Sequence, residues 1–433
     1  MAHDDASAAH PDVRTCPLHQ INAFDPELIQ DPYPYFERLR AEAPVYRDPA
    51  TGVVQVSTYD LVMEVNRQPH VFSSDFSTQL RSGAVAGIDP DEAAILAEGW
   101  PVANTMLTAD PPAHTRYRKL GMKAFTYKRV DGLGDYVAEV THDLIDGFIE
   151  AGACEFRAAF ASHLPMTIIA DSLGAPRADM EKFHRWSEAF VAQLGGISDK
   201  AARLDAARRI VEFQRYFVDI IEEKRVRPTE DVISDLVHAD LAEEGDPRKL
   251  DYSELISIIQ QLLVAGNETT THALTAGLYY LISNPEQMAA ARADPDLIPG
   301  LVEETLRFLT PTNNMWRVAT RDAEIGGVPV KQGDMILVRY GSANRDAAQF
   351  DDPDRFDLTR ENAKTHLAFG AGIHTCIGAQ LARKEMNTAF PILLERLKNL
   401  RFQEGRNDFR YSPNILLRGV TELHLAFDPG ARR

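Results

Sequence analysis

The pattern of apolar and polar positions predicts a chain that is mainly helical. Helical periodicity covers residues 31–43 and nearly all of residues 111–295, with breaks where glycine or proline interrupts it. The longest unbroken run spans residues 252–284, and Asp251 and Glu254 have the spacing of a capping box at its start. At 1.5 Å per residue this helix would be about 50 Å long, which is enough to cross a whole domain.

Short strands with turn residues between them are predicted at residues 45–57, 324–338 and 402–427, the last as a β-hairpin. A final helix is predicted from about Gly378 to Leu397, and we interpret residues 79–104 as a long, partly irregular loop. No linker rich in Pro, Gly and Ser divides the chain. We therefore expect one large domain, mainly α with small β-sheets (α+β), over residues 19–433, after a disordered tail at residues 1–18.

Composition excludes several classes of protein. The 433 residues are 44% hydrophobic and 25% charged, which is ordinary for a soluble globular protein and excludes a mainly disordered chain. The net charge of −18 argues against nucleic acid as a partner. No apolar run is long enough for a transmembrane helix and no signal-peptide pattern is present, so we expect a cytoplasmic protein that does not bind a membrane. Three cysteines form no disulfide framework, and the sequence suggests no role for Cys16 or Cys154.

The third cysteine, Cys376, lies in a glycine-rich turn directly before the final predicted helix. Free N–H groups and the dipole at a helix N-terminus favour a thiolate, which is the metal-binding form of cysteine. A lone cysteine in such a turn could also be a small buried apolar residue. Residues 369–378, however, have the pattern F-G-x-G-x-H-x-C-x-G, which resembles the heme-binding loop of the cytochrome P450 family. The resemblance covers nearly the whole chain after the N-terminal tail and implies the P450 fold.

The resemblance also implies a cofactor, heme b, with Cys376 as the proximal iron ligand. The thiolate would donate electron density that favours O–O cleavage. By the same resemblance, Phe369, Gly370 and Gly378 belong to the loop that lies against the heme.

Four further residues resemble those that contact the heme propionates, which need charge-assisted partners. His114 and Arg118 follow the sequence Asp-Pro-Pro and lie four residues apart, so they share one face of a helix. Arg317 and His374 complete the expected set. Any one of these side chains alone would more simply be a solvated surface residue.

Glu304 and Arg307 form an E-x-x-R sequence within a predicted helix, and their spacing places both side chains on one face. Without context this is a surface ion pair of little energetic value. In the P450 family it is a buried pair that supports the cysteine loop. Arg355, within Pro353–Phe356, is the expected third member, and we assign all three a structural role.

The middle of the long helix contains residues that are poor helix formers. Gly266 costs about 0.5–1 kcal/mol relative to Ala, and such local conflicts often mark functional sites. The alternative is a packing glycine beside a threonine that bonds its own helix. In the resembled family this helix crosses the distal face of the heme, where Ala265 and Gly266 make room for dioxygen. Glu268 and Thr269 are then the catalytic acid–alcohol pair that delivers protons.

The resemblance implies a monooxygenase that receives electrons from an iron–sulfur ferredoxin and an NAD(P)H-dependent reductase, because the chain has no nucleotide-binding fingerprint of its own. Six basic and no acidic residues occur from Arg116 to Arg129, in a segment that borders the proximal face in the family fold. A solvated helix face is the simpler alternative. The expected docking residues are Arg116, Lys119, Lys123, Lys128, Arg129, Arg383 and Lys384.

Substrate contacts are expected, by position in the family, at Val102, Leu107, Gln261, Val264, Ala265, Asn313, Met315 and Leu416. Most of these residues are apolar, as in other ligand pockets, and the two amides could bind a ketone or a hydroxyl group. We expect hydroxylation of an apolar molecule such as a terpenoid or a steroid. A peroxide-driven fatty-acid hydroxylase and a non-catalytic heme-thiolate sensor are the alternatives.

Overall fold

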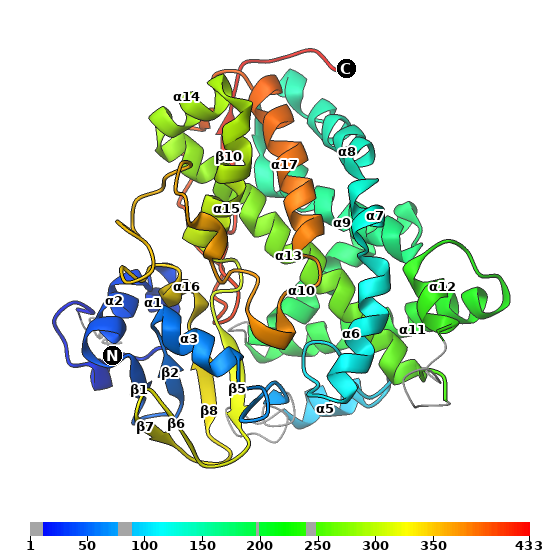
Figure 1. Ribbon diagram of the computed structural model, residues 1–433. Coiled ribbons are helices and arrows are strands. Elements are labelled where there is room, and N and C mark those ends of the chain that lie inside the picture. The colour runs from blue at the N-terminus through cyan, green and yellow to red at the C-terminus, as the bar shows by residue number, and fades with distance from the viewer. Residues whose placement is uncertain (1–11, 77–88, 196–198, 240–247) are drawn as a thin grey trace, which may run out of the picture.

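Helices form most of the chain, and the largest sheet lies at one side of them (Figure 1). The structure, a computed structural model, describes residues 12–76, 89–195, 199–239 and 248–433. The α-helices are α1 (Pro26–Gln30), α2 (Tyr33–Glu42), α3 (Tyr59–Asn66), α5 (Pro90–Leu96), α6 (Ala113–Ala124), α7 (Tyr127–Asp131), α8 (Gly134–Asp146), α9 (His163–Leu173), α10 (Met180–Gly195), α11 (Lys200–Val226), α12 (Val232–Val237), α13 (Tyr252–Ser283), α14 (Pro285–Ala293), α15 (Ile298–Leu309), α16 (Tyr340–Ala343) and α17 (Ala379–Arg396). The strands are β1 (Val45–Arg47), β2 (Val54–Val56), β3 (Phe72–Ser73), β4 (Ala153–Glu155), β5 (Met315–Ala319), β6 (Ala323–Ile325), β7 (Val328–Val330), β8 (Met335–Val338), β9 (Arg401–Phe402) and β10 (His424–Ala426).

The long central helix α13 begins with the predicted capping box. The Asp251 carboxylate accepts a hydrogen bond from Glu254 N at 2.9 Å, and the Glu254 carboxylate accepts one from Asp251 N at 3.0 Å. Helices α9, α10, α15 and α17 pack around α13, so most of its residues are buried. A helix that is covered on most sides is apolar over most of its surface, which agrees with the two ends of this helix.

Helix α17 crosses α13 closely and thereby places the cysteine loop that precedes it. The ring of Phe390 on α17 lies so near Gly277 on α13 that a Cβ there would be 2.2 Å from the ring. Glycine is therefore favoured at this crossing, because a side chain there would force the buried ring of Phe390 to shift. The predicted final helix agrees with α17 to within one residue at each end.

The largest sheet has the order β1-β2-β8-β5-β3, with β2 and β8 parallel and the other neighbours antiparallel. The predicted strands at residues 45–57 and 324–338 are confirmed as β1, β2, β6, β7 and β8. The C-terminal hairpin is confirmed in β9 and β10, and the distant β4 joins it as a third strand that periodicity did not predict. Strands of two or three residues are too short to show an alternating pattern.

Two segments differ from the sequence prediction at their edges. Of the predicted tail, residues 1–11 lie outside the described residues. The part that follows is held in place, because the guanidinium of Arg38 on α2 donates hydrogen bonds to the carbonyl groups of Val13 and Cys16. Of the predicted loop at residues 79–104, the part up to residue 88 also lies outside the described residues, and the part after it contains α5. No helix among the residues described is long and apolar enough to span a membrane.

Candidate active site

The cysteine loop places Cys376 at the N-terminus of α17. Cys376 N donates to Phe369 O at 2.8 Å, and the backbone N–H groups of Gly378 and Ala379 point toward the thiol. Burial raises the pKa of the Cys376 thiol, while these N–H groups and the guanidinium of Arg118 act in the opposite direction. Cys376 also keeps accessible surface.

The shape of this loop depends on Gly372, which starts a short 3-10 turn (Gly372–His374). Its φ is +72°, and a Cβ at this position would lie 2.3 Å from the carbonyl oxygen of Asn66 at the end of α3. Both the left-handed backbone and the close contact exclude a side chain. Gly370 also has a positive φ, of +66°, but a Cβ there would make only ordinary contacts, at 3.7 Å, with His374 O and the Tyr340 hydroxyl.

The four residues expected at an anionic group lie together beside this loop. The rings of His114 and His374 are 4.2 Å apart between centroids, and Arg118 donates to Thr375 O at 2.5 Å. Burial, followed by the positive charges of Arg317 and its neighbours, lowers the pKa of His374 to about 3, so its ring is neutral. The Nε2 atoms of His114 and His374 are buried and have no hydrogen-bond partner in the described part of the chain.

Within α13, Ala265 is exposed although most of the helix is buried. Thr269 Oγ1 donates to Ala265 O at 2.9 Å, so the threonine bonds its own helix. A Cβ on Gly266 would make ordinary contact, at 3.5 Å, with Ile169 of α9. Gly266 thus faces α9, and the space beside α13 is open at Ala265.

Glu268 lies at the centre of a buried polar cluster between α13, α10 and the π-helical turn Arg157–Ala161 that precedes α9. Its carboxylate is 3.3 Å from Arg157 Nη2, 3.5 Å from Ser187 Oγ and 3.7 Å from His272 Nε2. Burial raises the pKa of Glu268, and the charge of Arg157 opposes this only in part. Burial also lowers the pKa of His272 to about 3.

Sequence reasoning did not predict the partners of Glu268. His272 lies four residues after Glu268 on the same helix face, and that spacing is a signal that could have identified it. Arg157 is more than a hundred residues away in sequence, and no local pattern connects it to Glu268.

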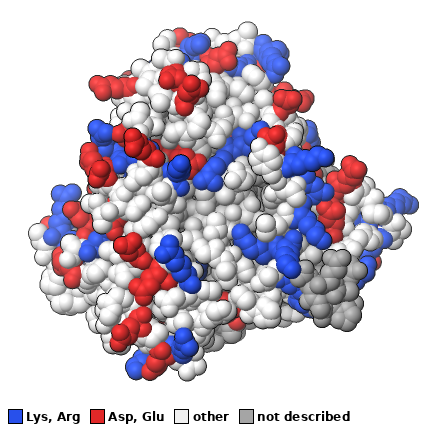
Figure 2. Space-filling model, viewed as in Figure 1, with Lys and Arg blue, Asp and Glu red and all other residues white. Residues whose placement is uncertain are grey.

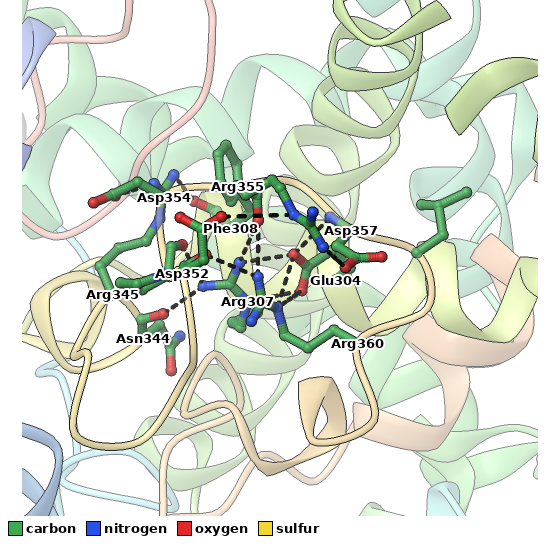
Figure 3. A network of polar contacts seen from close by, with 12 residues as sticks. Glu304, Arg307, Phe308, Asn344, Arg345, Asp352, Asp354, Arg355, Asp357 and Arg360 are labelled. Carbon is green, nitrogen blue, oxygen red and sulfur yellow. Dashed lines mark hydrogen bonds and ion pairs between the residues drawn. The ribbon is translucent and has the colours of Figure 1, made fainter. Parts of the chain in front are cut away.

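The E-x-x-R pair forms the centre of a buried network (Figure 3). Both side chains have no exposed surface, and the two Arg307–Glu304 hydrogen bonds are each 2.7 Å long. The prediction that Arg355 completes the set is wrong, because its side chain is 65% exposed and pairs with Asp352 and Asp357. Arg360 takes this place, with its Nε atom 3.2 Å from both Glu304 carboxylate oxygens.

The network reaches the cysteine loop through Asn344. Arg307 donates to Asn344 O at 2.8 Å, and Leu367 N donates to the side-chain oxygen of Asn344 at 2.7 Å. Leu367 lies two residues before Phe369. The network therefore ties α15 to the start of the loop that carries Cys376.

Comparison with known proteins agrees with this geometry. The family model for cytochrome P450 matches residues 198–419. The chain is 36% identical to cytochrome P450 107B1 of Saccharopolyspora erythraea over 94% of this chain and 98% of that protein. The chain belongs to the cytochrome P450 family. It is also 35% identical to a steroid C26-monooxygenase of Mycobacterium tuberculosis, over 90% of this chain and 99% of the relative. Among solved structures, the P450 CYP109E1 from Bacillus megaterium in complex with testosterone has a TM-score of 0.80 and 30% identity, and covers 93% of this chain and 100% of that one.

This P450 is a heme b protein and a monooxygenase of the bacterial type, and its residues fit the cofactor. Cys376 lies at a helix N-terminus, keeps accessible surface and has two backbone N–H groups directed at its sulfur, which is the environment of a thiolate ligand. The unpartnered Nε2 atoms of His114 and His374, beside Arg317 and Arg118, form a cluster of donors that suits the carboxylates of the propionates.

The predicted substrate residues of this P450 differ in how much accessible surface they keep. Val102, Leu107, Val264, Ala265 and Met315 keep accessible surface. Gln261 is engaged, because its side-chain oxygen accepts a hydrogen bond from Leu107 N at 3.1 Å. Leu416 is 0% exposed and Asn313 is 4% exposed, with the Asn313 amide packed against Gly341, so neither offers surface to a ligand in this structure.

The basic residues expected on the proximal face also divide into two groups. Lys119, Lys123, Lys128 and Arg129 are exposed. The others hold the fold together through ion pairs: Arg116 with Glu254 at 3.4 Å, Arg383 with Glu303 at 2.6 Å, and Lys384 with Asp131 at 3.2 Å. Arg129 is exposed and is also paired with Asp235 at 2.9 Å.

Proposed function

We propose that this P450 hydroxylates an apolar small molecule of the steroid or terpenoid type, with dioxygen and with electrons from an iron–sulfur ferredoxin. The observation that carries this proposal is the buried Glu268 cluster beside Thr269, because a protein that activates dioxygen must supply protons at that point of α13. The heme, when bound, would supply the oxygen activation itself, and the protein would supply the thiolate, the protons and the position of the substrate.

The local contacts suggest which step of proton delivery each residue would perform. Thr269 donates its own hydroxyl proton to Ala265 O, which leaves the lone pairs of Oγ1 able to accept a hydrogen bond from a protonated group above Ala265. The raised pKa of Glu268 makes its carboxyl group a better proton carrier near neutral pH. Arg157 is 26% exposed in its side chain and lies between Glu268 and the surface, so it marks the outer end of the proton route.

The surroundings of the predicted pocket support an apolar substrate. Five of the positions that keep accessible surface, from Val102 to Met315, are apolar; Gln261 also keeps some surface, but its side-chain oxygen is bonded to Leu107 N, and Asn313 is buried. Binding would then depend on shape and apolar contact. No arginine or lysine is among these positions, so a fatty-acid carboxylate has no anchor there. The steroid C26-monooxygenase and the testosterone complex among the similar proteins point to the same substrate class.

A ligand screen tests the substrate class. Steroids, terpenoids and long-chain fatty acids are titrated against the purified heme protein, and the spin-state shift of the ferric heme is recorded. Compounds that shift the spectrum are then incubated with NADPH, ferredoxin reductase and a plant-type [2Fe–2S] ferredoxin, or with hydrogen peroxide alone.

We expect steroids or terpenoids to shift the spectrum with micromolar affinity, and product to form in the complete ferredoxin system. A response to fatty acids alone with turnover only in peroxide would replace this proposal by the peroxide-driven hydroxylase. Ligand binding without product in either system would favour a sensor.

A further inference from the structure

Two large apolar side chains are strongly exposed where α6 ends and α7 begins. Met122 is 53% exposed and Tyr127 is 78% exposed, and among the described residues only Val102 and Val226 are comparable. Scattered single apolar residues on a surface are normal. Two of the four, Met122 and Tyr127, lie within six positions of one another, at the end of one helix and the start of the next, and we call these two residues the apolar patch.

The fold does not require these side chains. Tyr117 and Leu120 supply the buried face of α6, and Met122 points away from them. Tyr127 is the first residue of α7, directly after the cap Thr126, whose side chain accepts a hydrogen bond from Arg129 N. The cap sets the start of the helix and leaves the Tyr127 ring outside the core.

Four basic residues lie in the same stretch of sequence as the apolar patch. Lys119 and Lys123 are exposed on α6, and Lys128 and Arg129 are exposed on α7. Figure 2 shows blue side chains gathered to the right of the centre of the molecule, over the place of α6 and α7 in Figure 1. In a chain with a net charge of −18, this local excess of positive charge complements an acidic partner.

The helix α6, which carries Met122 near its end, packs on the cysteine loop. Gly121, the residue before Met122, packs so closely on the loop that a Cβ there would be 2.4 Å from Met106 Sδ and 3.1 Å from Ile377 Cδ1. Arg118, one turn earlier, bonds Thr375 O. Thr375 and Ile377 flank Cys376, so α6, the helix that carries Met122, contacts the loop on both sides of the cysteine.

We propose that Met122 and Tyr127 are the apolar anchor at which the electron-donor protein binds, and that the donor has an exposed apolar side chain within an acidic surface. This inference rests on the proposed function, because it assumes a ferredoxin donor. Interface energy concentrates in a few central residues, with Tyr among the most frequent, while charges at the rim mainly set the association rate. Tyr127 and Met122 would therefore control affinity, and the lysines would control its salt dependence.

The test follows the first electron transfer and needs no substrate oxidation. The heme protein is mixed under carbon monoxide with NADPH, ferredoxin reductase and increasing plant-type [2Fe–2S] ferredoxin, and formation of the ferrous carbon-monoxide spectrum is timed. The variants are Tyr127→Ala, Tyr127→Phe and Met122→Ala. Val226→Ala, which removes an equally exposed apolar side chain at the end of α11, is the matched control.

We expect Tyr127→Ala to raise the half-saturating ferredoxin concentration about 5- to 30-fold, with the same maximal rate and the same salt slope. Tyr127→Phe and Val226→Ala should stay within about twofold of the parent protein, and Met122→Ala should be intermediate. Reduction by dithionite should be unchanged in all variants, because it needs no docking.

The inference is overturned if Tyr127→Ala and Val226→Ala have the same half-saturating ferredoxin concentration. It is also overturned if Tyr127→Phe raises this concentration as much as Tyr127→Ala does. If the parent protein is reduced by ferredoxin but oxidises no substrate, the proposed function fails while this test still decides the anchor. If ferredoxin does not reduce the parent protein in a saturable manner, the ferredoxin donor and this anchor are both refuted.

Discussion

At the scale of single residues, neighbouring positions of α13 have different surroundings because successive side chains point about 100° apart around a helix. Glu268 enters a buried cluster with Arg157 and Ser187, while Thr269 turns toward the exposed side at Ala265. In the proposed function the two residues would act in sequence, because Glu268 would hold a proton inside the protein and Thr269 lies beside the exposed Ala265.

Removal of the Thr269 hydroxyl should separate electron consumption from product formation. In Thr269→Ala, NADPH oxidation should stay within about twofold of the parent protein, while product falls about tenfold or more and hydrogen peroxide accumulates. Parallel measurement of NADPH, product and peroxide checks this. Thr275→Ala is the control, because Thr275 makes the same bond to its own helix, at 2.7 Å from Thr271 O, two turns further along α13. Unchanged coupling in Thr269→Ala would contradict the proton role.

At the scale of elements, buried ion pairs connect segments that are far apart in sequence. The Glu304–Arg307–Arg360 network joins α15 to the segment 351–360 and, through Asn344, to the cysteine loop (Figure 3). Loss of one partner leaves a charge buried without compensation, which is more costly than the pair is stabilising.

Arg360→Ala and Arg355→Ala provide a matched pair that tests this network. Arg360→Ala should lower the free energy of unfolding by about 2–4 kcal/mol and reduce heme incorporation, because Glu304 keeps only one buried cationic partner. Arg355→Ala should change it by about 0.5 kcal/mol or less, since its side chain is 65% exposed. Urea unfolding and the heme content of the purified proteins measure both effects. Equal destabilisation by the two substitutions would refute the assignment of Arg360.

The cap of α13 predicts a pH dependence of stability. Burial raises the pKa of Glu254, but hydrogen bonds from Arg248, Tyr117 and the backbone of Asp251 outweigh this and lower it to about 2. A carboxyl group whose pKa is lowered by folding stabilises the protein fully above its unfolded pKa, near 4.5, and this contribution disappears as the pH falls toward 2. Unfolding experiments on Glu254→Gln should show a loss of about 1–2 kcal/mol at pH 7 that becomes smaller at pH 3. A constant difference between these pH values would contradict the charge-based account.

At the scale of the whole molecule, an acidic chain carries a basic face next to its cysteine loop. The net charge of −18 is an average, and the basic segment Arg116–Arg129 departs from it locally. Of the basic residues expected to dock a partner, Arg383, Lys384 and Arg116 form ion pairs within the protein, and Lys123 and Lys128 are exposed.

Charge reversal at Lys123 should weaken ferredoxin docking in a salt-dependent way. Lys123→Glu should raise the half-saturating ferredoxin concentration about 3- to 10-fold at low ionic strength, and the difference should shrink as salt screens the charges. Arg321→Glu, in the exposed turn between β5 and β6, is the control for a general change in net charge. An equal effect from both substitutions would show that only the total charge matters.

Local patterns were sufficient for the features that depend on neighbouring residues. The Gly-rich pattern around Cys376 indicated the family, and the periodicity with its Asp251–Glu254 cap indicated α13, because turns, caps and helices are determined within a few residues. Tertiary structure decided the partners: Arg360 and not Arg355 for Glu304, Arg157 for Glu268, and Leu107 for Gln261. The physical reason is that a buried charge or amide bonds to whichever distant group the packing brings within about 3 Å, and neither spacing nor composition encodes that distance.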